Sequence, residues 1–206
     1  MKTIESPAKG ISYITFTLLL ALYFALVVNI PIYKELVHIF SGLDQVKIGF
    51  IITIPIFFFA ALNFLFNLFS WPWIGKPFFI FLLITSGMVS YASYNYGTLF
   101  DTDMITNIVE TDTSEASSYL STYSVIWTVI MGVIPALLVF KLKFKPLKDQ
   151  WLRFALTKVV SMLASLVVIA IIAGLYYQDY ASVGRNNSYL KKSSSRLNTC
   201  TRSLAM

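Results

Sequence analysis

Hydrophobic residues in this chain gather in long blocks that short polar stretches separate. A helix needs about 20 mainly apolar residues to cross the ~30 Å hydrocarbon core of a bilayer, and lipid offers no partner to an unpaired backbone group. The pattern therefore predicts an all-α fold, that of a polytopic membrane protein with five transmembrane helices. The predicted spans cover residues 11–32, 48–69, 78–94, 123–140 and 154–177.

The first block follows Lys2 and Lys9, as the apolar core of a secretory signal would. Its apolar run is longer than the ~7–15 residues of such a core, and no cleavage site of the A-x-A kind follows it. We therefore interpret residues 11–32 as a retained first span.

Composition supports membrane insertion and excludes several other classes. Hydrophobic residues make up 57% of the 206-residue chain and charged residues 13%, whereas soluble domains carry about 25% charged residues. The net charge of +6 does not indicate a nucleic-acid partner, because the basic residues flank the predicted spans. A single cysteine, Cys200, and a single histidine, His38, exclude an intrachain disulfide and a metal site built from His and Cys.

The basic residues also predict the orientation. Residues 141–153 join the last two spans and hold five lysines or arginines, which is typical of a cytoplasmic loop. The N-terminus is then cytoplasmic, and residues 33–47 and 97–121 are periplasmic. Residues 33–47 are amphipathic and predict a short helix along the membrane surface, with His38 as an exposed interfacial side chain. The C-terminus is then periplasmic, although basic residues after Gln178 oppose this assignment.

Few polar groups lie inside the predicted spans. Lys158 is the one charged residue there, and it lies about one turn from the cytoplasmic end, where its amine can reach water. This argues against a proton or ion relay through the bundle. Asn63 and Asn67 lie one turn apart and are predicted to hydrogen-bond between helices rather than to bind substrate. Pro55 and Pro135 are predicted to kink their helices.

The candidate chemistry lies in the polar segment 97–121, which holds five acidic residues and no Lys or Arg. Asn107, Thr111 and Glu115 recur every four residues, a spacing that places them on one face of a helix. At a membrane surface these groups suit a zwitterionic head group. The carboxylate would pair with an ammonium, and the amide and hydroxyl would bond phosphate or ester oxygens. A solvated acidic helix face would show the same spacing.

Two motifs resemble those of a known family. Tyr-Asn-Tyr-Gly at 94–97 is followed at 104–120 by a stretch containing Val-Glu-Thr-Asp and Glu-Ala-Ser-Ser-Tyr-Leu, and Tyr-Tyr-Gln-Asp-Tyr-Ala-Ser begins at Tyr176. The first stretch resembles the periplasmic loop of lipid A phosphoethanolamine transferases, and the second resembles the exit of their last membrane helix. That family includes the mobile colistin-resistance enzymes and shares the five-span plan. The resemblance covers residues 1–192, which we interpret as the transmembrane domain.

The resemblance implies a location and a reaction. Such enzymes lie in the inner membrane of Gram-negative bacteria and transfer phosphoethanolamine from phosphatidylethanolamine to a phosphate of lipid A, which confers polymyxin resistance. In the family, the positions matching Asn107, Thr111 and Glu115 help to form the pocket for the ethanolamine-bearing substrate. Glu115 is then expected to contact the ammonium, and Asn107 and Thr111 the phosphate side.

The resemblance also implies parts that this chain lacks. In the family, a threonine nucleophile and zinc ligands lie in a soluble, sulfatase-like domain that follows the membrane domain. The chain ends at Met206, and residues 193–206 do not resemble the family's continuation. They are polar, basic and aperiodic, which predicts an aberrant, disordered tail after a frameshift or early stop. We therefore expect no catalytic residue, metal or cofactor in this chain, zinc in the missing domain, and no transfer by the chain alone.

Two other interpretations stay open. The chain could be a complete small membrane protein that binds lipid or assists another protein without catalysis. It could also be a transporter, although the scarcity of charge within the spans disfavours that class. Within the family interpretation, the acceptor could be lipid A or another glycan phosphate.

Overall fold

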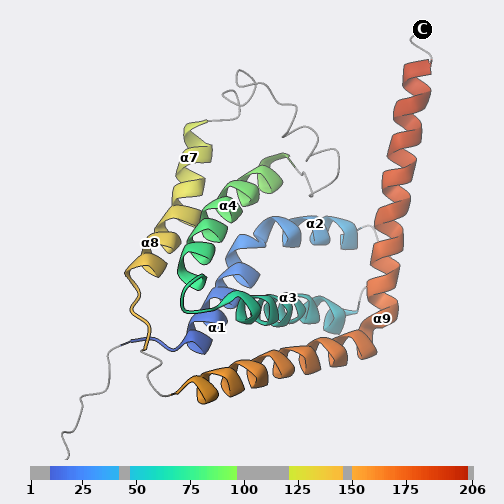
Figure 1. Cartoon of the computed structure of the whole chain (residues 1–206). Helices are drawn as coiled ribbons and strands as arrows, with labels where there is room; N and C mark the ends of the chain where they lie inside the picture. The colour runs from blue at the N-terminus through green and yellow to red at the C-terminus, as the bar shows by residue number, and fades with distance from the viewer. Residues whose placement is uncertain (1–9, 42–46, 97–120, 146–149, 204–206) are drawn as a thin grey trace, which may run out of the picture.

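The computed structural model describes residues 10–41, 47–96, 121–145 and 150–203, and these residues form a bundle of helices (Figure 1). Within them, β-structure is limited to an isolated bridge between Ile11 and Phe144. The helical elements, in chain order, are α1 (Tyr13–Tyr23), η1 (Phe24–Val28), α2 (Ile30–Ser41), α3 (Ile48–Phe69), α4 (Gly75–Tyr96), α7 (Thr122–Thr128), η2 (Val129–Val133), α8 (Ile134–Lys141) and α9 (Trp151–Ser203). The elements labelled η are π-helical.

The membrane class predicted from the sequence is confirmed. Among the described residues, four continuous helical segments are long and apolar enough to span a bilayer: Ile48–Phe69, Gly75–Asn95, Thr122–Lys141 and Trp151–Gln178. A bent pair, Tyr13–Val28 with Ile30–Val37, gives a fifth span if it is counted as one. The protein is therefore an all-α, multi-pass membrane protein, and α3 covers the same residues as the predicted second span.

The first span differs from its predicted extent of residues 11–32. The helix axis turns by 45° between Val28 and Ile30, and α2 then continues as a separate helix. Pro31, one residue into α2, has no N–H to donate and restricts the residue before it, so a straight α-helix is disfavoured here. The helix that was predicted within residues 33–47 is thus α2, which begins earlier. Its placement along a membrane surface stays a prediction.

A second π-helical segment, η2, precedes Pro135 in α8. In a regular helix the amide of residue 135 would bond the carbonyl of Met131, and proline lacks that amide. The hydroxyl of Tyr23 donates to this carbonyl instead, at 2.7 Å. Pro135 was predicted to kink its helix, and the structure has a π-helical segment just before it. Pro55 was predicted to kink its helix too, and α3 continues as one helix through it.

Glycine allows α4 to approach η2 closely. A Cβ atom on Gly132 would lie 2.9 Å from the carbonyl oxygen of Leu83, and one on Gly87 would lie 3.0 Å from Cα of Gly132. Backbones of membrane helices approach this closely where the facing residues are small. The contact therefore holds the fourth span against α4.

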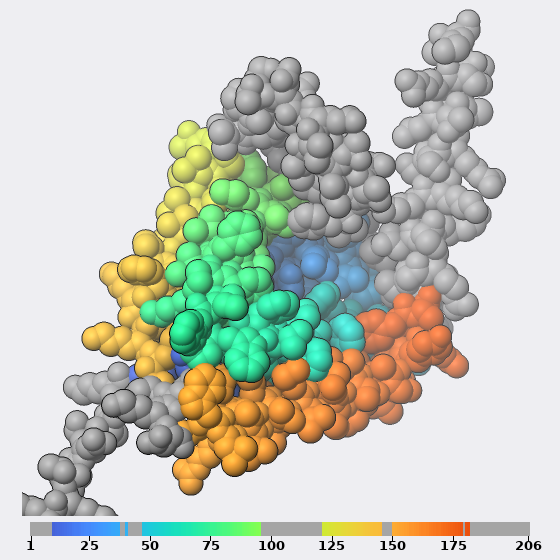
Figure 2. All heavy atoms as spheres, in the orientation of Figure 1, coloured from blue at the N-terminus to red at the C-terminus, as the bar shows by residue number. Residues whose placement is uncertain are grey.

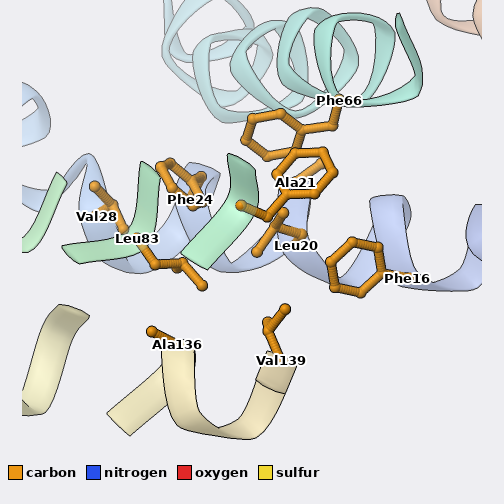
Figure 3. Packing of buried hydrophobic residues seen from close by; sticks show 10 residues of the cluster. Phe16, Leu20, Ala21, Phe24, Val28, Phe66, Leu83, Ala136 and Val139 are labelled. Atoms are coloured by element: carbon orange, nitrogen blue, oxygen red, sulfur yellow. The ribbon is translucent and has the colours of Figure 1, made fainter. Parts of the chain in front are cut away.

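The core lies where α1, η1, α3, α4 and α8 meet. Figure 3 shows side chains from α1 and η1 facing Phe66 of α3 on one side and Ala136 and Val139 of α8 on the other, with Leu83 of α4 between them. The rings of Phe24 and Phe66 pack edge to face at a centroid distance of 5.1 Å. The remaining core residues belong to the same cluster: Phe16, Leu20, Ala21, Val28 and Phe79.

Helix α9 lies outside this core, along α3 (Figures 1 and 2). It bends at Tyr176, whose φ of −123° and ψ of 20° are not helical. Gly49 of α3 lies directly against the hydroxyl end of the Tyr176 side chain, so α3 and the bend in α9 are in close contact there. Tyr180 lies just beyond the bend. Burial raises the pKa of its phenol above the usual value, and a side-chain hydrogen bond with Thr53 has the smaller, opposite effect.

The backbone of α9 is helical as far as Ser203. The sequence has no Gly or Pro after Gly184, so it contains no residue that would end the helix sharply. The aberrant, disordered tail predicted for residues 193–206 stays a prediction.

Candidate functional site

The three predicted site residues, Asn107, Thr111 and Glu115, lie outside the described residues, as does nearly all of segment 97–121. The structure does describe where this segment leaves α4 and where it rejoins the bundle at α7 (Figure 1). The two helices that the segment connects touch near it, because the hydroxyl oxygens of Tyr91 in α4 and of Ser121 at the start of α7 lie 3.2 Å apart. Ser121 also starts α7, since its side chain accepts from the amide of Ser124 at 3.1 Å.

Four aromatic side chains lie near the end of α4 and in α7, on either side of this segment in the sequence. We call them the aromatic cluster: Tyr91, Tyr94, Tyr123 and Trp127. The centroids of Tyr94 and Trp127 are 5.0 Å apart, and those of Tyr91 and Tyr123 are 5.8 Å apart. Trp127 also packs edge to face on Tyr123 at 5.9 Å. Tyr and Trp rings concentrate at the boundary between lipid and water, so the cluster indicates that the segment emerges at the membrane surface.

A cation from α2 lies against this cluster. Lys34 places its Nζ 4.2 Å from the centroid of the Tyr94 ring and donates to the Tyr94 carbonyl oxygen at 3.3 Å. That carbonyl lies in the last turn of α4, where the helix dipole favours positive charge. The bend at the start of α2 thus brings a lysine to the place where the acidic segment begins.

Neither the aromatic cluster nor Lys34 was predicted as part of the site from the sequence. A usable signal was present, because Tyr91 and Tyr94 are three residues apart and Tyr123 and Trp127 four apart, which places each pair on one helix face. Both pairs directly flank segment 97–121. Lys34 carried no such signal, since its position depends on the turn between η1 and α2.

A second polar region joins α3 to α9. The side-chain amide of Asn63 donates to Ser161 Oγ at 3.2 Å and to Ser165 Oγ at 2.9 Å. Asn67 donates to Ser161 Oγ at 3.2 Å. The prediction that the two asparagines hydrogen-bond between helices is therefore confirmed.

Lys158 lies at the end of this polar region and differs from its prediction. Its side chain is 5% exposed, so its amine does not extend into open water. It donates to the carbonyl oxygen of Ser70, directly after α3, at 3.1 Å, and lies 4.1 Å from the Trp71 ring. The cation thus caps the negative end of α3 and ties the start of α9 to it.

Metal-binding side chains do not gather in the described part of the chain, where no group of three or more His, Cys, Asp or Glu residues lies close enough to share an ion. The whole sequence holds one His and one Cys. The described residues therefore do not form a site for zinc, which the resemblance places in the family's soluble domain.

Comparison with known proteins gives a consistent result. The family model described as phosphoethanolamine transferase EptA/EptB matches residues 58–199. EptA of Escherichia coli K12 is 28% identical over 190 residues, which are 92% of this chain and 35% of that protein. Phosphatidylethanolamine transferase Mcr-2 of Escherichia coli is 28% identical over 167 residues, 81% of this chain and 30% of the relative.

A solved structure agrees with these matches. The integral membrane protein lipooligosaccharide phosphoethanolamine transferase A (EptA) from Neisseria meningitidis superposes with a TM-score of 0.71 at 30% identity. The match covers 87% of this chain and 33% of the solved chain. The chain thus spans about a third of the length of the relatives it matches.

Proposed function

The chain belongs to the EptA/EptB phosphoethanolamine transferase family, and from this premise we propose that it forms the membrane module that binds the donor lipid for transfer to lipid A. The observation that carries the proposal is the match over residues 58–199, which includes α3 from Phe58 onward, α4, α7, η2, α8, the spanning part of α9 and the whole acidic segment. The donor would be phosphatidylethanolamine, and the transfer would contribute to polymyxin resistance by reducing negative surface charge.

The proposed donor site is the face formed by Asn107, Thr111 and Glu115. Glu115 binds the ammonium of the head group, because a charge-assisted hydrogen bond to a carboxylate is the strongest contact available to that group. Asn107 and Thr111 bond the phosphate or ester oxygens. The contact between Tyr91 and Ser121 and the aromatic cluster support this role, since they hold the last turns of α4 against the start of α7, and such aromatic rings lie at the level of lipid head groups.

The proposed setting is the bacterial inner membrane, with the N-terminus cytoplasmic and the C-terminus periplasmic. The acidic segment would then face the periplasm, and the basic residues 141–153 the cytoplasm, as the distribution of Lys and Arg predicts.

The proposed role is to bind and place the donor. We ascribe the phosphoryl-transfer chemistry, with its zinc and threonine nucleophile, to the soluble domain that the resemblance places after the membrane domain. No step of that chemistry is assigned to residues of this chain.

The experiment that tests donor binding compares two acidic residues of one segment. The purified 206-residue chain in neutral detergent is titrated with short-chain phosphatidylethanolamine and phosphatidylcholine, and binding is followed by calorimetry. Glu115→Gln should weaken the binding of phosphatidylethanolamine by roughly tenfold, because it removes a hydrogen bond to a charged group. Glu110→Gln is the matched control, because Glu110 lies five residues before Glu115, so on a helix the two carboxylates point to different sides. This variant should change binding by less than about twofold.

Equal binding of the two lipids by the parent chain would overturn the donor-binding role. Equal losses in the two variants would overturn the assigned face while leaving the role intact.

A further inference from the structure

The end of the bundle opposite the acidic segment carries an ordered extended strip at residues 142–145. The amide of Ile11 donates to the Lys143 carbonyl at 2.9 Å, and the amide of Lys145 donates to the Ile11 carbonyl at 3.1 Å. A Cβ atom on Gly10 would lie 3.0 Å from backbone atoms of this strip, so the chain entering α1 fits closely along it. Figure 1 shows the strip passing beside the start of α1. It is therefore held in place by backbone contacts.

Side chains alternate along this strip. Leu142 and Phe144 are half-buried, and the Phe144 ring stacks on Tyr13 at a centroid distance of 4.5 Å. Lys143 and Lys145 are exposed, as is Lys141 at the end of α8. Alternate residues of an extended chain point to opposite sides and are about 6.6 Å apart along it. The packing of Phe144 inward therefore presents the lysines outward as a row.

The neighbouring lysines are already used within the bundle. Lys76 donates to the Phe140 carbonyl at the end of α8, at 3.0 Å, and Lys158 donates to Ser70. By contrast, the side-chain amines of Lys141, Lys143 and Lys145 make no hydrogen bond or ion pair with any other described residue. The sequence between Glu115 and Asp149 contains no acidic residue. The row thus presents positive charge that the described structure does not neutralise.

Exposed tryptophans indicate where this row of lysines lies relative to the membrane surface. Trp151 packs on Phe154, which packs on Tyr13, the ring that Phe144 covers. Trp151 itself is 52% exposed, and Trp73, in the turn after α3, is 88% exposed. Exposed Trp rings anchor membrane proteins at the head-group level. The row therefore lies at the height of lipid phosphates.

We propose that Lys141, Lys143 and Lys145 form a docking surface for anionic phospholipid head groups. Each lysine near an anionic leaflet contributes attraction, and a row held by backbone bonds loses little freedom when it binds phosphate. The surface is separate from the donor site, so this inference does not rest on the proposed function.

The test uses tryptophan fluorescence in vesicles. The 206-residue chain with Trp127→Phe keeps its tryptophans at this end only, namely Trp71, Trp73 and Trp151. It is placed in phosphatidylcholine with either brominated phosphatidylglycerol or brominated phosphatidylcholine, because bromine on the acyl chain quenches nearby tryptophan. The quenching curves should give a preference of about fivefold or more for the anionic lipid, as roughly 1 kcal/mol per lysine allows. The preference should weaken at high salt.

Three variants isolate the row. Replacing all three lysines by glutamine should reduce the preference to within about twofold of unity, since most of the lysine contribution is lost. Replacing them by arginine should retain it, which separates charge from folding. The matched control, Arg185→Gln with Lys191→Gln and Lys192→Gln, removes the same charge from the far part of α9 and should leave the preference unchanged. No preference in the parent chain, persistence in the glutamine variant, or an equal fall in the control would overturn the proposal.

Discussion

The contact of α4 with η2 and the contact of α3 with α9 join membrane helices by different means. The first brings Gly87 and Gly132 together, so that backbone packs against backbone. The second is made by Asn63 with Ser161 and Ser165, and by Lys158 with the end of α3. Lipid tails are as apolar as the helices, so burial of apolar surface alone does not drive helix association. The two contacts show the two remaining ways to hold a helix: close packing and hydrogen bonding.

The largest effect is expected where packing alone holds the helices. Gly132→Val places branched carbons where a single Cβ would already lie 2.9 Å from the Leu83 carbonyl and 3.2 Å from the Cα of Ile84, both backbone atoms. Overpacking of this kind costs about 1–3 kcal/mol or more, so the variant should unfold at a markedly lower temperature in detergent, followed by circular dichroism. The control is Gly174→Ala in α9, where a Cβ would meet nothing within 4 Å. A Gly132→Val chain as stable as the control would show that α4 and η2 are not closely packed.

A smaller effect is expected at the polar contact. Asn63→Ala removes two hydrogen bonds from α3 to α9, and such bonds contribute about 0.6–1.7 kcal/mol each in a membrane. The loss should fall mainly on α9, so hydrogen exchange of residues 158–172 should become faster while that of α4 stays unchanged. Asn95→Ala is the control, because Asn95 is exposed and its side-chain amide donates to the Tyr91 carbonyl oxygen within its own helix. Faster exchange in both helices alike would contradict a contact that holds α9 in particular.

The smallest effect is expected at the π-helical segment. Tyr23→Phe removes the hydroxyl that donates to the Met131 carbonyl, which should lower stability by about 1 kcal/mol. The same measurement of thermal unfolding applies, with Tyr177→Phe as the control, since the Tyr177 side chain is 72% exposed. If the two phenylalanine variants behaved alike, the hydroxyl of Tyr23 would have no role in supporting η2.

The sequence predicted the parts of this fold that depend on local pattern. Apolar blocks of span length gave the helices, and two asparagines one turn apart gave the polar contact. The winding at η2 could not be read in this way, because the hydroxyl that supports it comes from Tyr23, more than a hundred positions earlier. The contact of Lys158 with Ser70 could not be predicted either, because Ser70 is distant in the sequence and lies directly after another helix, α3. The position of Lys34 beside Tyr94 depends on the bend before α2. No periodicity in the sequence signals that bend.

The candidate site divides in a similar way. Asn107, Thr111 and Glu115 were chosen for their spacing and resemblance, and they stay predictions because they lie outside the described residues. The aromatic cluster at the root of their segment is described, and the spacing of its residues within α4 and α7 would have been enough to find it.

The contact between Tyr91 and Ser121 has a consequence for how this family can vary. Because α4 and the start of α7 are bonded to each other independently of the segment that connects them, lengthening that segment costs little, since doubling a loop adds only about 0.6 kcal/mol of closure entropy. If the segment binds the donor head group as proposed, its chemistry can change by substitution or insertion while the contact between α4 and α7 is kept.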